Sequence, residues 1–124
     1  DIEEIETHFS LAYWCTCPKA NWYIEKQLPN YDLWRKKNLK ITIGTDSLAS
    51  NDTLSVLEEV KMIQKNFPHI STNELLIWAC KNGAEFFNYD ELGSFKTGSK
   101  PGIILIEDID GLQLTEKSRV TVLV

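Results

Sequence analysis

Two short apolar segments in the first third of the chain have the pattern of buried β-strands. Residues 11–17 are apolar and aromatic until Pro18 stops the run, and residues 40–44 are rich in β-branched side chains. Short continuous apolar runs are typical of strands in parallel sheets, which are covered on both faces. We therefore predict two strands, at 11–17 and 40–44, that lie side by side and run parallel.

The segment between these strands has no clean hydrophobic period. It contains the turn formers Pro29 and Asn30, so we predict a long loop over residues 19–30 and a short helix around 31–37. Loops of this length usually carry function or are disordered.

Helical spacing of apolar residues predicts three further helices. The first ends near residues 8–10, the second covers 56–67 until Pro68 closes it, and the third covers 71–86 with an interruption at 82 and 83.

The last third of the chain changes from helical to β character. Turn-forming residues are frequent within 92–102, and two apolar segments at 103–106 and 120–124 predict strands. The order of the predicted elements indicates an α/β architecture with an appended β unit.

Composition and charge restrict the kinds of partner. A net charge of −5 without a basic cluster longer than residues 35–37 argues against a nucleic-acid surface. No apolar run approaches the roughly 20 residues of a membrane helix, so we expect neither nucleic acid nor membrane as a partner.

The cysteines lack the paired spacing of a disulfide framework, so we expect the protein to lie in the reducing cytoplasm. Residues 1–6 have neither an initiator Met nor targeting features, so we expect a chain already under way.

Three motifs occur in order along the chain. They are Cys-Pro-Lys-Ala-Asn at 17–21, Gly-Thr-Asp-Ser-Leu-Ala-Ser-Asn at 44–51, and Trp-Ala-Cys-Lys-Asn-Gly-Ala at 78–84 followed by Gly-Ser-Phe-Lys-Thr-Gly-Ser-Lys at 93–100. Together they resemble the amidohydrolase superfamily of metal-dependent hydrolases, of the aminohydrolase and chlorohydrolase type. The second motif is the specific one.

The chain departs from the family pattern at several positions. Ala20 stands where the family often has serine, Cys80 where threonine is usual, and residues 101 and 102 where an Ala-Asp pair normally opens the strand. None of these departures affects Asp46.

The metal-binding histidines of the family are missing from this chain. The family places most of its metal ligands on earlier barrel strands, whereas His8 and His69 occupy no matching motif. The resemblance therefore implies a C-terminal portion of the enzyme. Residues 1–92 resemble the last two strand-helix units of a (β/α)8 TIM barrel, and residues 93–124 resemble the C-terminal half of a small β-sandwich domain.

Asp46 is the residue that the resemblance singles out for chemistry. The matching aspartate of the family binds the metal and shuttles a proton, so the resemblance implies both roles for Asp46. It also implies one divalent metal ion, zinc or iron, in the complete enzyme. Taken alone, residues 45–47 also fit a structural strand-to-helix turn. For Ser50 and Asn51 we expect a structural role, bracing the loop after Asp46 or starting the next helix.

Asn21 and Trp22 are the candidate substrate-binding residues. The Asn21 amide offers a donor and an acceptor to a substrate or to the loop over the site, and the Trp22 ring can stack on a heteroaromatic substrate. The structural alternatives are a turn after Pro18 for Asn21 and core or lid packing for Trp22.

Cys15 and Cys17 lie two apart on a predicted strand and should face the same way, which would suit thiolate metal ligation. A closed zinc site needs about four ligands and no second pair is nearby, so we expect buried apolar cysteines instead.

The function implied by the resemblance is metal-dependent hydrolysis of a small cyclic C–N compound, by deamination or dechlorination through a metal-activated water. The implied partners are a small-molecule substrate and the remaining barrel segment of the same enzyme, and a homo-oligomer is compatible with the sequence. We expect the chain alone to be inactive. The alternative is a non-catalytic α/β binding or assembly module, which the missing histidines favour for the isolated chain.

Overall fold

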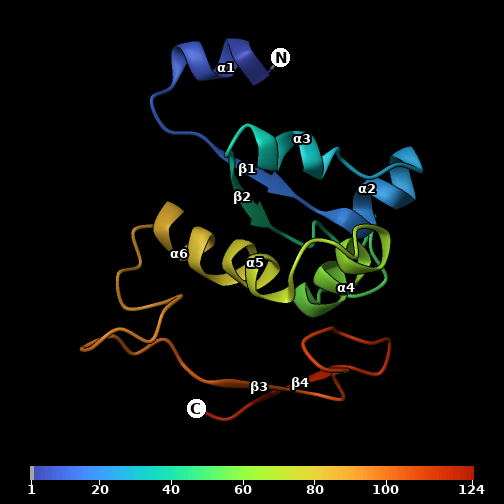
Figure 1. Cartoon of the computed structure of the whole chain (residues 1–124), viewed down its shortest axis with the longest axis vertical. Helices are drawn as coiled ribbons and strands as arrows, with labels where there is room; N and C mark the ends of the chain where they lie inside the picture. The colour runs from blue at the N-terminus through green and yellow to red at the C-terminus, as the bar shows by residue number, and fades with distance from the viewer. Residues whose placement is uncertain (1) are drawn as a thin grey trace.

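The computed structural model describes residues 2–124, and Figure 1 shows the arrangement of their elements. In chain order these are α1 (Ile2–His8), β1 (Tyr13–Thr16), α2 (Pro18–Glu25), α3 (Tyr31–Lys36), β2 (Lys40–Ile43), α4 (Val56–Asn66), α5 (Thr72–Leu76), a π-helical turn η1 (Ile77–Lys81), α6 (Asn82–Phe86), β3 (Ile104–Glu107) and β4 (Arg119–Val122). The chain is therefore of mixed α/β type, and the predicted end of the first helix near residues 8–10 is confirmed.

The strands β1 and β2 form a parallel pair, as the sequence predicts. Their register runs from Tyr13 opposite Lys40 to Thr16 opposite Ile43, and the Gly44 N–H extends the ladder by donating to the Thr16 carbonyl at 2.9 Å. Because the strands are parallel, their carboxyl ends meet at one edge of the sheet. The segments that follow β1 and β2 therefore start next to each other.

One face of this two-stranded sheet carries the hydrophobic core. Ile41 and Ile43 point into it, together with buried residues of α3, α4 and the α5–η1 helix. At its centre Tyr31 is fully buried and lies edge-on against Phe67, with ring centroids 5.1 Å apart. The Tyr31 hydroxyl also shares a 2.8 Å hydrogen bond with Thr16, so its polar end is satisfied inside the core.

Residues 18–25 after β1 form helix α2, which corrects the first part of the predicted loop over residues 19–30, whereas residues 26–30 are non-helical as predicted. Helix α2 begins directly at Pro18, the first helical position that proline favours because its missing N–H has no intrahelical partner there. Only Pro18 and Ala20 of this helix are buried, so it lacks the apolar stripe that would reveal a helix in the sequence. The short helix predicted around 31–37 is confirmed as α3.

The helix from α5 to α6 is continuous but contains a π-helical turn. The sequence predicts an interruption at residues 82 and 83, whereas the irregular turn lies just before them, at η1. Asn82 follows this turn, and its buried side-chain amide donates to the Ile41 carbonyl at 2.6 Å. Asn82, which the sequence pattern marks as a helix breaker, therefore binds the helix to β2.

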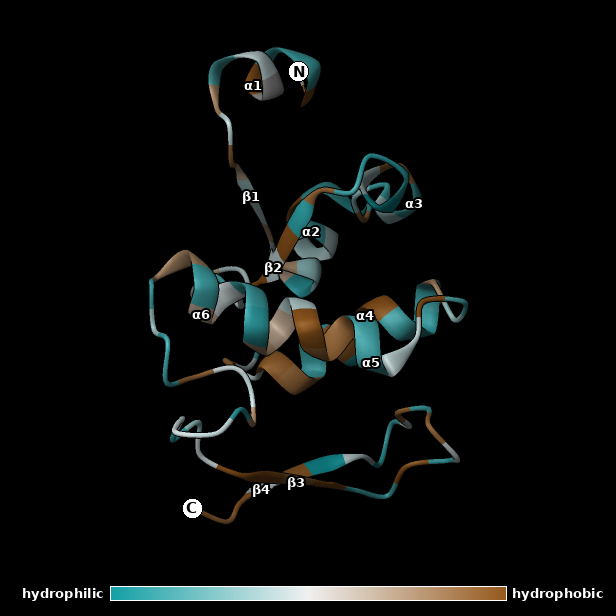
Figure 2. Cartoon of the chain, turned by 60° about the vertical axis from the view of Figure 1, so that its left-hand side comes forward, coloured by the Kyte–Doolittle hydropathy of each residue, from teal (hydrophilic) through white to brown (hydrophobic). Residues whose placement is uncertain are grey.

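The C-terminal segment forms the antiparallel hairpin β3–β4, close to the two strands predicted there. The connection between these strands contacts α4: the Leu114 N–H donates to Gln64 Oε1 at 2.7 Å, and Lys65 Nζ lies 3.0 Å from Glu116 Oε1. Hydrophobic residues lie along both strands (Figure 2), and Val122 is 73% exposed. Residues 93–124 therefore present apolar surface that the other described residues leave exposed. The domain boundary at 92 stays a prediction.

We predict that Ile63→Ala lowers the free energy of unfolding by about 2–5 kcal/mol, because it empties fully buried volume at the centre of the core. The matched control is Ile77→Ala, a helical isoleucine that is 39% exposed, for which we expect less than about 1 kcal/mol. Urea denaturation followed by the fluorescence of buried Trp78 measures both. Equal losses would show that the core does not lie where the structure places it.

Candidate active site

Asp46 lies just beyond the carboxyl end of β2, after Gly44 and Thr45. Its side chain is exposed, and its backbone adopts the left-handed conformation with φ of 55°. This conformation costs a non-glycine residue about 1–2 kcal/mol, so surrounding contacts must hold the loop. The strained residue in the loop is the one with the proposed chemistry.

Two side chains of the same loop hold Asp46 in this position. Ser50 is buried, and its hydroxyl donates to Oδ2 of Asp46. Asn51 is also buried, and its Nδ2 donates to the Thr45 carbonyl at 2.8 Å. The expected bracing roles of Ser50 and Asn51 are confirmed, whereas the next helix starts later, at Ser55, whose side chain caps α4.

A buried carboxylate on α4, Glu59, connects this loop to the segment after β1. It accepts from Asn51 Nδ2 at 2.5 Å and from the Lys19 backbone N–H at 2.8 Å. Burial raises the pKa of Glu59, while these donors act in the opposite direction by favouring the charged form. Sequence reasoning missed Glu59, although a signal existed: it lies on the apolar stripe of α4, next to buried Val60.

Asn21 and Trp22 lie in α2, which begins directly after β1. Asn21 is half-buried and its Oδ1 accepts from the Thr16 hydroxyl at 3.3 Å, so the side chain is held toward the core. Trp22 is 45% exposed and not packed into the core. Both residues belong to the same sheet edge as Asp46, but among the contacts of residues 2–124 none joins either of them to it.

Cys15 and Cys17 lie on the face of the sheet opposite the core, which contradicts the prediction of buried cysteines. Cys15 and Cys80 are exposed and Cys17 is half-buried. A Cβ placed on Gly44 would lie 3.2 Å from Cys17 Sγ and 3.3 Å from Cys15 Sγ, so both sulfurs flank that glycine. Burial raises the pKa of Cys17 to about 11, and the nearby Cys15 acts in the same direction. The prediction is wrong because the described helices that form the core pack on the opposite face of the sheet, and α6 contacts this face at Tyr13 and Lys40, at the start of the strands.

The described residues do not form a complete metal-binding donor set. Within the described residues, no three histidine, cysteine, aspartate or glutamate side chains are placed to hold a metal ion together. His69 is an exposed surface residue, and its Nε2 lies 2.7 Å from Asp32 Oδ1. Asp46 can contribute one carboxylate oxygen, since Oδ2 already accepts from Ser50. A complete site would need ligands from outside this chain.

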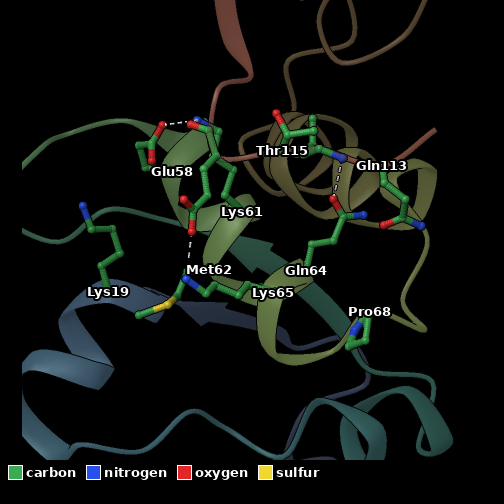
Figure 3. A pocket seen from close by; sticks show the side chains of 11 residues that line it. Lys19, Glu58, Lys61, Met62, Gln64, Lys65, Pro68, Gln113 and Thr115 are labelled. Carbon is green, nitrogen blue, oxygen red and sulfur yellow. Dashed lines mark hydrogen bonds and ion pairs between the residues drawn. The ribbon is translucent and has the colours of Figure 1, made fainter. Parts of the chain in front are cut away.

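A hollow of about 650 Å³ is lined mainly by α4 and by the connection between β3 and β4 (Figure 3). Two of the lysines that line this hollow form ion pairs. Lys61 Nζ lies 2.6 Å from Glu58 Oε1, and Lys65 Nζ lies 3.0 Å from Glu116 Oε1. Asp46 is not among the residues that line it. We therefore place the candidate site at the sheet edge and not in this hollow.

Comparison with known proteins identifies the family. A sequence model of the amidohydrolase family matches residues 1–123. The chain belongs to the amidohydrolase family. This membership confirms the resemblance on which the sequence analysis rests.

Several relatives of this amidohydrolase chain are named as deaminases. The chain is 32% identical over 101 residues to 5-methylthioadenosine/S-adenosylhomocysteine deaminase of Thermoanaerobacter pseudethanolicus, covering 75% of this chain and 23% of the relative. It is 32% identical over 68 residues to aminodeoxyfutalosine deaminase of Deinococcus radiodurans, covering 55% and 16%. It is 26% identical over 87 residues to adenosine deaminase of Helicobacter pylori, covering 68% and 21%.

The matched relatives are much longer than this amidohydrolase chain, which spans less than a quarter of their length. No solved structure matches it. None of the helices within residues 2–124 is long and apolar enough to cross a membrane.

We predict that the isolated chain does not bind zinc tightly, because one carboxylate leaves most of the coordination shell to water. Calorimetric titration with zinc should show no stoichiometric site of submicromolar affinity. Such a site, if lost in Asp46→Ala, would contradict the prediction and direct attention to Cys15 and Cys17 as further ligands. The matched control is Asp52→Ala, which removes an exposed carboxylate of the next turn.

Proposed function

We propose that this chain is the Asp46-bearing C-terminal part of a metal-dependent amidohydrolase that deaminates a small cyclic C–N compound. The observation that carries the proposal is the position of Asp46, an exposed carboxylate at the carboxyl end of a strand in a parallel pair. Active sites of (β/α)8 barrels are built at that end of the strands. Membership of the amidohydrolase family supports the same reaction class.

We further propose that β1 and β2 are the last two strands of such a barrel, within residues 1–92, and that residues 93–124 complete a β-sandwich. Two features support this. Cys15 is exposed on the face of the sheet opposite the core, where α6 contacts Tyr13 and Lys40 at the start of the strands, and each strand is paired on one side only within the described chain. A barrel would pair both free edges and enclose that face.

Deamination is favoured over dechlorination by the names of the three relatives reported above, each of which is named as a deaminase. A divalent ion, zinc or iron, would supply the Lewis acidity that makes water nucleophilic near neutral pH. Asp46 would hold that ion with one oxygen, accept the proton of the attacking water and return it to the leaving amine. Ser50 would keep the carboxylate oriented while this proton moves.

Asn21 and Trp22 are proposed to contact the substrate on the β1 side of the site. Trp22 has the exposed ring area for stacking on a heteroaromatic ring. Asn21 is already bonded to Thr16 through Oδ1, which leaves its amide N–H groups available as donors. Asn21 is therefore proposed to donate to a substrate acceptor while Thr16 fixes its orientation.

We predict that Asp46→Asn in the complete enzyme abolishes turnover while the fold stays intact. The amide keeps the side-chain volume but can neither accept the proton nor carry the charge that a metal site requires. General base catalysis alone accounts for about 10²–10⁴-fold in rate, and weakened metal binding adds to this loss. Steady-state kinetics and metal content measure the two effects separately.

The control is Asp90→Asn, the same chemical change at an exposed residue after α6. We expect its activity to stay within about threefold of wild type, since an exposed side chain outside the candidate site contributes little. If Asp46→Asn kept its metal and more than about a tenth of the wild-type rate, Asp46 would be a structural turn residue.

A further inference from the structure

Glu59 is a fully buried carboxylate for which the proposed chemistry has no direct use. It lies in the first turn of α4 and has no exposed surface. A carboxylate removed from water is costly unless hydrogen bonds or charges satisfy it. Its partners therefore show what the burial achieves.

Each oxygen of Glu59 accepts from a different segment of the candidate site. Oε2 accepts a hydrogen bond from the backbone N–H of Lys19, in the first turn of α2, with an N···O distance of 2.8 Å. That N–H has no intrahelical acceptor, and the residue before α2, Cys17, provides no side-chain cap. The carboxylate thus fixes the start of the helix that carries Asn21 and Trp22.

The other oxygen, Oε1, accepts a hydrogen bond from the side-chain amide of Asn51, with Nδ2 at 2.5 Å. The same Nδ2 donates at 2.8 Å to the carbonyl of Thr45, the residue before Asp46. An amide nitrogen carries two hydrogens, so both bonds can exist at once. Glu59 thereby holds, through Asn51, the loop in which Asp46 has its left-handed backbone.

We propose that Glu59 is a positioning residue that holds the Asp46 loop and the start of α2 at a fixed separation. The inference rests on the proposed function, because it assigns catalysis to Asp46 and substrate contact to α2. Glu59 itself touches neither a substrate nor a metal. A surface ion pair between Lys19 and Asp52 joins the same two segments, but it is exposed on the Asp52 side and contributes less.

The test replaces Glu59 by Gln in the complete enzyme. Gln has the same shape, but its NH2 group replaces one carboxylate oxygen. That group would face the Lys19 N–H or the Asn51 amide, so one of the two hydrogen bonds is lost. The matched control is Glu58→Gln, which removes the neighbouring first-turn carboxylate of α4. Glu58 interacts with the α4 dipole in the same way but pairs with Lys61, and so it holds neither segment.

Residue-resolved hydrogen exchange is the first measurement. In Glu59→Gln, exchange at the Lys19 amide and across residues 45–51 should rise by about tenfold or more, as expected when a buried charged hydrogen bond is lost. Amides near Ile63 should stay unchanged. A uniform rise across the chain, no rise, or the same pattern in Glu58→Gln would overturn the proposal.

Steady-state kinetics is the second measurement. We expect kcat of Glu59→Gln to fall by about 10- to 100-fold while KM changes by less than about threefold, because misplacing a catalytic group affects the reacting geometry more than binding. Unchanged kcat in the presence of the exchange effect would overturn the catalytic part of the proposal. If wild type does not deaminate, the proposed function fails, while exchange still decides whether Glu59 holds the two segments.

A second variant covers the case in which Glu59→Gln does not fold. Asn51→Ala removes the link on the Asp46 side only and leaves Glu59 its bond from Lys19. Exchange should then rise across residues 45–51 but not at the Lys19 amide. Faster exchange at both places would show that the two segments are not held separately by the two oxygens.

Discussion

The parallel pairing of β1 with β2 determines where each residue of the candidate site lies. Parallel strands bring their carboxyl ends to one edge, so the segment with Asn21 and the loop with Asp46 start side by side. Helix α4 packs behind this edge and inserts Glu59 between the two segments. The local strain at Asp46 is acceptable because the loop is held at several points, through Ser50 and through Asn51.

The same pairing leaves the chain with an unfinished surface. Among the described residues, helices cover the face that carries Ile41 and Ile43, whereas on the other face Cys15 is exposed and Thr42 only half-buried. Apolar residues of the C-terminal hairpin are exposed as well, such as Val122. The relatives are more than four times as long as the aligned part of this chain. A longer protein that encloses these surfaces is consistent with the family membership and with the proposal that Asp46 binds a metal together with further ligands.

The sequence predicted what depends on local pattern. Both parallel strands, the helix around 56–67 and the exposed Asp46 at the end of β2 follow from apolar runs, helical spacing and a specific motif. It failed where packing between distant segments decides. Helix α2 buries only two residues and so has no period, and Cys15 is exposed because the described helices pack on the opposite face of the sheet. The role of Glu59 depends on contacts with Lys19, far away in sequence, which no local pattern encodes.

The measurement that tests the central claim most directly is anomalous diffraction at the zinc edge from crystals of the complete enzyme grown with zinc. The account predicts an anomalous peak about 2.0–2.2 Å from an Asp46 carboxylate oxygen, the usual zinc–carboxylate distance. It also predicts that the face of β1 and β2 opposite the core turns toward that peak. A zinc ion bound by other residues, with the Asp46 carboxylate outside coordination distance, would contradict the assignment of Asp46 as a metal ligand.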